Sequence, residues 1–276
     1  MATEAPPVPA LSPAAQAFDA VADAFDSRFG PWLSVAAQRR AVRAALADAF
    51  PAGARVLEVG GGTGEDARWL AERGRDVLLT DASPAMVRIA SAKLAGTRAR
   101  AALAPAEALD SIAADGPFDG AFSNFAALNC VGDLRPVARG LAGLLRPGAP
   151  ALLVLFGPLP PGEIVVETLR GRPRSAFRRL ARGDVPARLG GRDFIVRYHR
   201  QAAVARAMAP WFRPVRCLGI GVCMPPSAAE PWISRHPRLV RMLEAADRAL
   251  ARPLALLGDH VLYHFARTGA PVEAAE

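Results

Sequence analysis

The sequence has almost no lysine, few cysteines and no long apolar run. Lys93 is the only lysine among 276 residues, so arginine supplies nearly all of the 34 basic side chains. No run reaches the roughly 18 apolar residues that a membrane span needs, so we expect no membrane partner. The Pro- and Ala-rich start lacks the positive and apolar parts of a signal peptide.

The three cysteines, Cys130, Cys217 and Cys223, form no C-x-x-C pair. This argues against a disulfide framework or a zinc site, and it favours a reducing, cytoplasmic location. No cluster of His, Cys and Asp has metal-ligand spacing, so no metal is expected. A Walker loop and a Gly-x-Ser-x-Gly elbow are also missing, which argues against P-loop nucleotide chemistry and α/β hydrolases.

The net charge of +8 could indicate a nucleic acid or an acidic substrate. Eleven arginines lie within residues 170–206, opposed only by Asp184 and Asp193. Charge runs are more often solvated surface than binding sites, and the abundance of Arg, Ala, Gly and Pro also fits a coding bias. Nucleic acid is therefore an unlikely partner, while an acidic acceptor held by the arginines stays open.

The most informative stretch is Arg55–Asp66, in which an apolar, β-branched run meets a glycine cluster and then a helical pattern. This predicts a strand, a tight turn and a helix start, with free N–H groups at the carboxyl end of the strand. Gly60 and Gly62 match the first two glycines of the dinucleotide fingerprint G-x-G-x-x-G. Glu65 stands at the third position, which weakens a dinucleotide interpretation.

The pattern of an acid followed by three alternate glycines (Glu58, Gly60, Gly62, Gly64) resembles motif I of class I S-adenosylmethionine (SAM) dependent methyltransferases. The resemblance implies that the glycine loop, including Gly61, lies under the methionine part of SAM, and that Glu58 supports its ammonium group. Asp81 ends the next apolar run, nineteen residues after Gly62. An acid at this spacing can accept both hydroxyls of a ribose, in SAM or in NAD.

Further segments resemble the same family as far as about residue 156. Pro105 stands where the family usually has an Asp for the exocyclic amine, so adenine recognition would depend on backbone and stacking. The resemblance implies SAM contacts from the end of the second strand, the third-strand loop, the end of the fourth strand and an N-terminal helix. These contacts fall on Ala82, Met86, Ala106, Glu107, Ser123, Asn124, Phe125 and Phe25.

Strand and helix patterns alternate from Arg55 to Phe156, which predicts an α/β fold with a doubly wound, mostly parallel sheet. The resemblance implies seven strands, the last two forming an antiparallel hairpin, preceded by two N-terminal helices. One amphipathic helix is expected around Phe18–Phe29. On this basis we expect residues 1–11 to be disordered and residues 268–276 to form a loose tail. Residues 12–267 should form one domain. Within it we expect the SAM core at 52–156, a lid insertion at 157–210, and C-terminal strands and a helix at 211–267.

Methyl transfer is an in-line displacement that depends mainly on alignment, and a hydroxyl acceptor gains from a general base. His199 and Tyr198, at the end of a strand in the lid, are the first candidates, with His260 and His236 behind them. We predict methylation of a small, partly apolar acceptor, with a weak preference for oxygen. Three alternatives remain: a nucleic-acid methyltransferase, an NAD-dependent oxidoreductase and a non-catalytic SAM-binding protein. The oligomeric state is not predicted.

Overall fold

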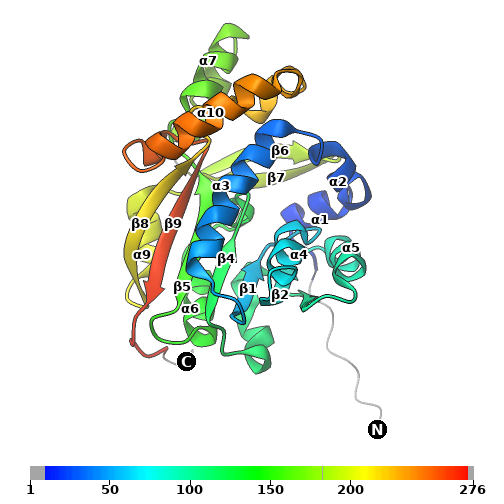
Figure 1. The fold of residues 1–276 in the computed structure, drawn as a ribbon, viewed down its shortest axis with the longest axis vertical. Helices are drawn as coiled ribbons and strands as arrows, with labels where there is room; N and C mark the ends of the chain where they lie inside the picture. Colours follow the sequence, from blue (N-terminus) through cyan, green and yellow to red (C-terminus); the bar gives the residue numbers. More distant parts are fainter. Residues whose placement is uncertain (1–9, 182, 273–276) are drawn as a thin grey trace.

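The computed structural model describes residues 10–181 and 183–272. A seven-stranded sheet runs through its centre in the order β3-β2-β1-β4-β5-β9-β8 (Figure 1). Neighbouring strands from β3 to β5 are parallel, whereas β9 is antiparallel to both β5 and β8. The strands are β1 (Arg55–Val59), β2 (Asp76–Asp81), β3 (Ala99–Leu103), β4 (Gly120–Ser123), β5 (Pro150–Phe156), β8 (Phe212–Ile220) and β9 (His260–Arg267). The predicted sheet and its C-terminal antiparallel hairpin are confirmed.

Each face of the sheet is covered by helices, because a parallel sheet must bury both faces. Alternate residues of one strand serve opposite layers: Val56 packs with one apolar cluster, and Leu57 and Val59 with the other. The first layer contains α3 (Leu33–Ala49), α4 (Glu65–Ala71) and α5 (Pro84–Leu94). The second contains α6 (Leu134–Leu144), α9 (Gln201–Met208) and the 3₁₀ segment η1 (Ala106–Asp115).

The N-terminal region differs from the single helix expected around Phe18–Phe29. It forms two helices, α1 (Pro13–Asp19) and α2 (Ala22–Phe29), which together with α3 make three helices before the sheet instead of two. Asp19, at the end of α1, accepts hydrogen bonds of 2.8 Å from the Ser83 hydroxyl and the Ala85 amide. This contact to the start of α5 fixes α1 separately from α2, and the chain turns between them.

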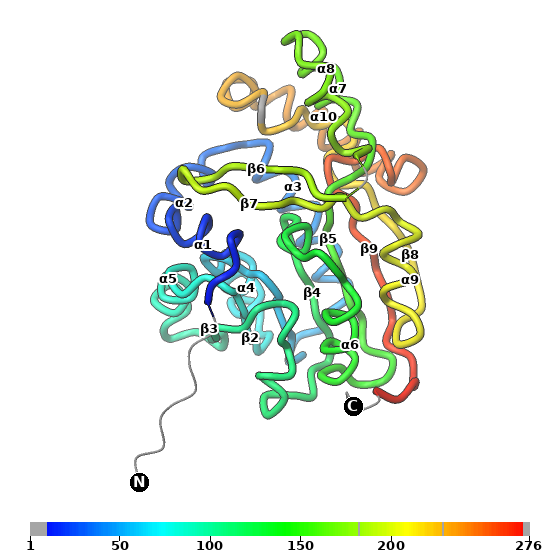
Figure 2. The backbone as a smooth tube through the Cα atoms, turned by 180° about the vertical axis from the view of Figure 1, so that it is seen from behind, coloured from blue at the N-terminus to red at the C-terminus, as the bar shows by residue number. Residues whose placement is uncertain are grey.

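Residues between β5 and β8 form the predicted insertion. It holds α7 (Pro161–Leu169), the single turn α8 (Pro173–Ala176), η3 (Arg178–Leu180) and a separate hairpin of β6 (Asp184–Leu189) and β7 (Arg192–Arg197). The hairpin lies next to α1, whereas α7 and α8 project at one end of the molecule (Figure 2). The two hairpin strands are antiparallel and are joined by a turn at Gly190–Gly191.

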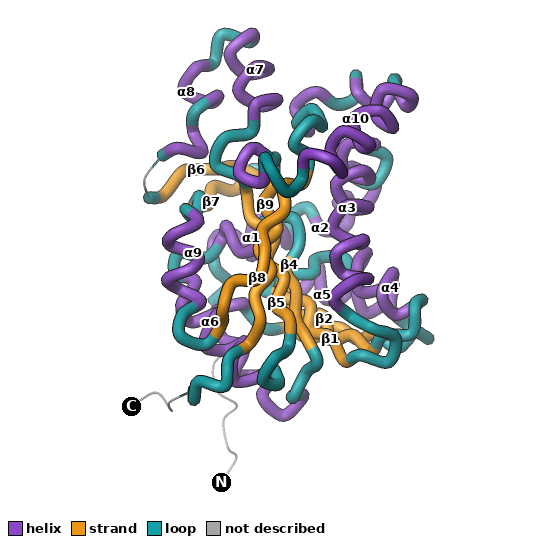
Figure 3. The backbone as a smooth tube through the Cα atoms, turned by 60° about the vertical axis from the view of Figure 1, so that its left-hand side comes forward, coloured by secondary structure: helices purple, strands orange, loops and turns teal. Residues whose placement is uncertain are grey.

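The remaining elements are helix α10 and four short 3₁₀ turns. Helix α10 (Pro237–Leu250) lies beside α3 (Figure 3). Short 3₁₀ turns are η2 (Ala127–Cys130), η4 (Ser227–Ala229), η5 (Ile233–Arg235) and η6 (Ala255–Leu257). No helix in the described ranges is long and apolar enough to cross a membrane. The predicted disorder at 1–11 falls mostly on residues 1–9, outside the described residues. Of the predicted loose tail at 268–276, residues 273–276 also lie outside, whereas residues 268–272 are described and contact Trp211 and Arg267. The domain limits stay a prediction.

Candidate active site

A cavity of about 270 Å³ opens at the carboxyl ends of β1, β2, β4 and β5. This is the crevice where open α/β sheets bind ligands. Its floor is the glycine loop after β1, and its cover comes from α1, α2 and β7. Of the residues predicted to bind SAM, those lining it are Phe25, Glu58, Gly60, Gly61, Gly62, Asp81, Ala82, Met86, Ala106, Glu107, Asn124 and Phe125.

The end of β2 and the glycine loop are joined directly. Asp81 accepts a hydrogen bond of 2.9 Å from the Gly62 amide and another of 2.9 Å from the Ser83 amide. Burial raises the pKa of Asp81, and these two amides partly oppose the rise. Gly62 has φ +56°, and a Cβ there would meet no protein atom within 4 Å. The loop therefore exposes its backbone to the cavity, next to the Asp81 carboxylate, which can accept further hydrogen bonds.

Glu58 lies beneath this loop and is 2% exposed. A Cβ added at Gly61 would come within 2.5 Å of the Leu79 side chain and 2.8 Å of the Glu58 carboxyl carbon, so any larger residue there would push these side chains aside. The Glu58 Oε2 atom finds no hydrogen-bond partner within the described chain. Burial, and then the nearby Asp66, raise the pKa of Glu58 well above its ordinary value. A cation bound here would give this carboxylate the partner it lacks.

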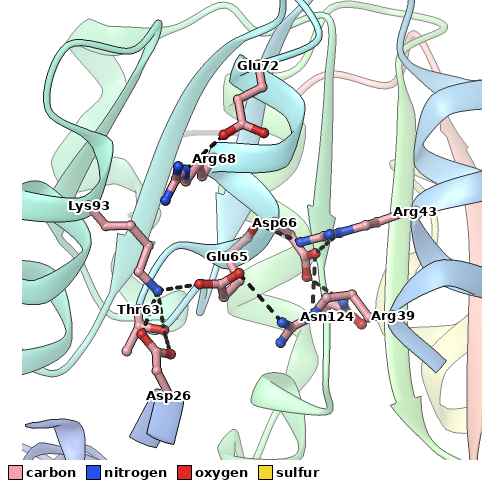
Figure 4. A network of polar contacts seen from close by, with 10 residues as sticks. All are labelled: Asp26, Arg39, Arg43, Thr63, Glu65, Asp66, Arg68, Glu72, Lys93 and Asn124. Carbon is pink, nitrogen blue, oxygen red and sulfur yellow. Dashed lines mark hydrogen bonds and ion pairs between the residues drawn. The ribbon is translucent and has the colours of Figure 1, made fainter. Parts of the chain in front are cut away.

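A polar network supports the same end of the cavity (Figure 4). The buried Asp66 carboxylate accepts hydrogen bonds of 2.7 Å from Asn124 Nδ2 and from Arg43 Nε. Arg39 lies 3.7 Å from the same carboxylate and also lines the cavity. Sequence reasoning selected Asn124 but missed Asp66, Arg39 and Arg43. Asp66 stands two residues after Gly64, and this position was the only available signal.

The turn after β4 carries backbone strain. Phe125 has φ +49° and Ala126 has φ +59°, the left-handed region that costs a non-glycine residue about 1 kcal/mol or more. The Arg39 guanidinium lies 5.0 Å from the centroid of the Phe125 ring. Strain of this kind collects at functional sites and is held there by surrounding contacts. The turn directs the Phe125 ring against the cavity.

At the opposite end of the cavity the lining side chains are mainly apolar. Met86, Ala82 and Ala106 supply apolar wall, and Ser83 caps α5 by accepting a 3.1 Å hydrogen bond from the Met86 amide. Cys130 also lines this part. Burial, with smaller contributions from Asp81 and Glu107, raises the pKa of its thiol to about 11. The thiol therefore stays protonated at neutral pH and acts as an apolar contact.

Helix α2 is fastened over the glycine loop by the only lysine of the chain. Lys93 Nζ, on α5, lies 2.6 Å from Asp26 of α2 and 2.6 Å from Glu65 of α4 (Figure 4). The Thr63 hydroxyl donates a 2.6 Å hydrogen bond to the other oxygen of Asp26. These contacts join three helices around one amine. The cover of the cavity is therefore an ion-paired structure and not only an apolar one.

The remaining wall is aromatic. Phe18 lies 6.4 Å from Phe25 and 5.9 Å from Phe194, measured between ring centroids. Phe125 and Phe156 complete the set, and all five rings line the cavity. They come from α1, α2, β7 and the ends of β4 and β5. The predicted position of Phe25 at the cavity is thus observed, together with four aromatic neighbours.

Four predicted site residues do not reach the cavity wall. Ser123 is fully buried inside the sheet, and Gly64 brings α4 close to Ala90 of α5. His199 contacts the Val131 carbonyl at 3.0 Å through Nε2, and Tyr198 packs on Phe156 with ring centroids 5.7 Å apart. Burial lowers the pKa of His199 and raises that of Tyr198. The insertion therefore turns its hairpin strand, and not its polar end, toward the cavity.

His260 is the imidazole that approaches the wall from behind. Its ring stacks on Phe156 at 5.1 Å and meets Phe125 edge-on at 6.0 Å. Its Nδ1 atom lies 3.2 Å from Asp259 Oδ2. Burial alone would raise the pKa of Asp259, but His260 and Arg179 hold it well below its usual range. Neither His199 nor His260 lines the cavity, but His260 is the one that contacts two of the wall rings.

The residues present fit SAM as a ligand. The orphaned Glu58 oxygen suits an ammonium group, the open backbone at Gly62 suits a close ligand, and Asp81 suits a pair of hydroxyls. The described residues contain no group of three or more His, Cys, Asp or Glu side chains placed to hold a metal ion. The sheet order, the glycine loop and Asp81 together define the class I methyltransferase fold.

Comparison with known proteins agrees with this class. The family described as methyltransferase domain matches residues 56–148, which span β1 to the turn before β5. Residues 56–148 thus resemble a methyltransferase domain, and SAM is the cofactor that the fold and the glycine loop of such a domain imply. No curated protein matches the chain.

Solved structures share the fold at low sequence identity. The CcbJ methyltransferase from Streptomyces caelestis is 18% identical with TM-score 0.58, over 92% of this chain and 98% of that one. The [4+2]-cyclase SpnF is 16% identical with TM-score 0.58, over 95% and 99%. A SAM-dependent methyltransferase from Mesorhizobium loti is 20% identical with TM-score 0.53, over 85% and 100%. Such similarity concerns the fold.

Proposed function

We propose that the protein transfers a methyl group from SAM to a small, largely apolar molecule, with oxygen as the favoured acceptor atom. The observation that carries the proposal is the aromatic half of the cavity. Five phenylalanine rings adjoin the glycine loop, under a cover formed by α1, α2 and β7. A covered pocket of about 270 Å³ suits a small molecule better than a polymer.

The chain's own residues supply binding and alignment. When bound, SAM supplies an electrophilic methyl group on a sulfonium. Asp81 would hold the ribose hydroxyls, Glu58 the ammonium group, and Met86 one face of the adenine. Phe125 and Phe156 would confine the acceptor and exclude water. Positioning of this kind is worth about 7–11 kcal/mol in well-oriented reactions, so a strong catalytic group is not required.

The preference for oxygen rests on the His260 imidazole, which we propose as the proton acceptor. His260 touches two wall rings, and Asp259 next to Nδ1 orients it. His260 does not itself line the cavity, so an acceptor hydroxyl would have to reach it between the Phe125 and Phe156 rings. The hydroxyl proton would then pass to the imidazole as the oxygen–methyl bond forms and the sulfur–methyl bond breaks. We expect His260→Gln to lower turnover about 10²-fold for a hydroxyl acceptor. His199→Gln, whose ring nitrogen contacts the Val131 carbonyl, serves as the control.

The first experiment is calorimetric titration with SAM, S-adenosylhomocysteine and NAD, followed by mass spectrometry of a panel of small phenols, amines and thiols incubated with SAM. Binding of both adenosyl compounds with a gain of one methyl on a phenol is the expected result. Binding without transfer to any acceptor would instead favour a SAM-binding protein. Transfer only to RNA would favour the nucleic-acid alternative, whereas the family match argues against the NAD-dependent oxidoreductase.

A further inference from the structure

Residues 161–181 form a protruding tip that the active site does not explain. The tip contains α7, α8 and η3, of which α7 and α8 pack against each other. In Figures 1 and 2 it lies at one extremity of the molecule, beyond the sheet. Its outer surface is therefore accessible to a binding partner much larger than the protein itself.

Large apolar side chains on the tip face water. Val165 and Leu169 are four residues apart on α7, so they lie on one side of that helix. Phe177 and Leu180 belong to the neighbouring turns. Their exposed fractions are 56% for Val165, 82% for Leu169, 50% for Phe177 and 43% for Leu180. Four such side chains within sixteen residues make an exposed apolar patch, which usually marks an interaction surface.

The acidic side chains of the tip are buried, whereas some of its basic side chains are exposed. Its two acids are buried: Glu163 pairs with Arg178 and Arg179, and Glu167 pairs with Arg170. Arg172 and Arg174 are exposed, and their side chains make no hydrogen bond or ion pair with the described residues. The exposed large apolar and charged side chains of the tip are thus apolar or positively charged, with no exposed acid between residues 161 and 181.

We propose that this tip docks on the surface of an anionic lipid bilayer. Aliphatic side chains such as Leu169 gain from contact with acyl chains, and arginines gain from contact with anionic headgroups. Nucleic acid would reward stacking aromatics, whereas three of the four exposed side chains, Val165, Leu169 and Leu180, are aliphatic. A second copy of the chain would bring like-charged arginines together across a two-fold axis. The lack of a spanning helix is compatible with surface docking.

The base of the tip connects it to the cavity. Buried Arg179 donates a 2.6 Å hydrogen bond to Asp259, and its guanidinium lies 4.8 Å from the centroid of the Phe156 ring. Phe156 is part of the aromatic wall. A docked tip would therefore be linked to the aromatic wall of the cavity through Arg179 and Phe156.

Vesicle co-sedimentation of the full chain tests the proposal without knowledge of the acceptor. The probes are vesicles of phosphatidylcholine alone and of phosphatidylcholine mixed with phosphatidylglycerol. We expect at least about tenfold stronger partitioning to the anionic vesicles, and weakening as salt rises. The double variant Arg172→Glu/Arg174→Glu should lose at least about 25-fold, because each basic residue near an anionic surface contributes about fivefold. Leu169→Asp/Phe177→Asp should lose at least tenfold.

A matched control changes the same residue types on the edge strand β8. Val215 is 48% exposed and Arg213 is also exposed, so Val215→Asp/Arg213→Glu should bind vesicles like the wild type. Thermal unfolding of all variants checks that each is folded. Equal partitioning of the wild type to both vesicle types would overturn the proposal. Binding unchanged by the tip variants would also overturn it, as would tip-dependent binding of RNA or of a second copy without binding of vesicles.

Discussion

The Asp81 carboxylate accepts a 2.9 Å hydrogen bond from the Gly62 amide, so the acid that ends β2 also holds the glycine loop that follows β1. Asp81 thus has two roles: it is placed to bind the ligand, and it stabilises the conformation of the glycine loop.

Asp81→Ala should weaken SAM binding by at least about 30-fold, or about 2 kcal/mol, because hydrogen bonds to a charged group and the loop contact are both lost. Calorimetry with S-adenosylhomocysteine measures the loss. Asp76→Ala, at the other end of β2 and exposed beside Arg98, is the control and should leave affinity unchanged. Equal affinities for wild type and Asp81→Ala would contradict the assigned site.

Glu58→Gln should stabilise the ligand-free protein while weakening SAM binding. Burial raises the pKa of Glu58 above its ordinary value of 4.5. Its contribution to stability is therefore complete below that value and is lost as pH rises toward the raised pKa of the folded state. The stabilisation by Gln should thus be clear at about pH 8 and vanish at about pH 4. Thermal unfolding across pH checks this, with exposed Glu107→Gln as the control.

Lys93→Met should lower the free energy of unfolding by about 1–3 kcal/mol, since it leaves Asp26 and Glu65 facing each other without a cation. It should also increase the dissociation rate of SAM, because α2 covers the loop. Urea unfolding and stopped-flow release give the two values. The comparison is Arg88→Met, whose exposed pair with Asp23 should contribute less than about 1 kcal/mol. Similar losses in both variants would argue against the special role of Lys93.

Cys130 should react slowly with iodoacetamide near neutral pH, and its rate should rise about tenfold per pH unit until about 11, the raised pKa of this buried thiol. A variant with Cys217→Ser and Cys223→Ser isolates the reaction. S-adenosylhomocysteine should protect Cys130, since this residue lines the cavity. Fast, pH-independent labelling that ignores the ligand would place Cys130 outside the site.

The sequence predicts those parts of the site that follow from local order. Gly60, Gly62 and Asp81 stand at strand ends, and the carboxyl ends of parallel strands meet at one edge of the sheet. These features need no knowledge of how distant segments pack.

The parts that sequence reasoning missed depend on distant partners. Arg39 and Arg43 resemble any other arginine in an arginine-rich chain, and only the packing of α3 on α4 brings them to Asp66. The break between α1 and α2 depends on Asp19 meeting the start of α5. His260 came second to His199 because nothing local shows that β9 pairs with β5, where Phe156 and His260 become neighbours.

The position of β9 also dictates an order of assembly. During synthesis β8 emerges before β9, yet β9 lies between β8 and β5. Until the ribosome has released β9, the β5 edge and the whole of β8 lack their hydrogen-bonding partner. Nascent chains halted before residue 260 should therefore expose two unpaired edges, and such edges recruit chaperones or aggregate.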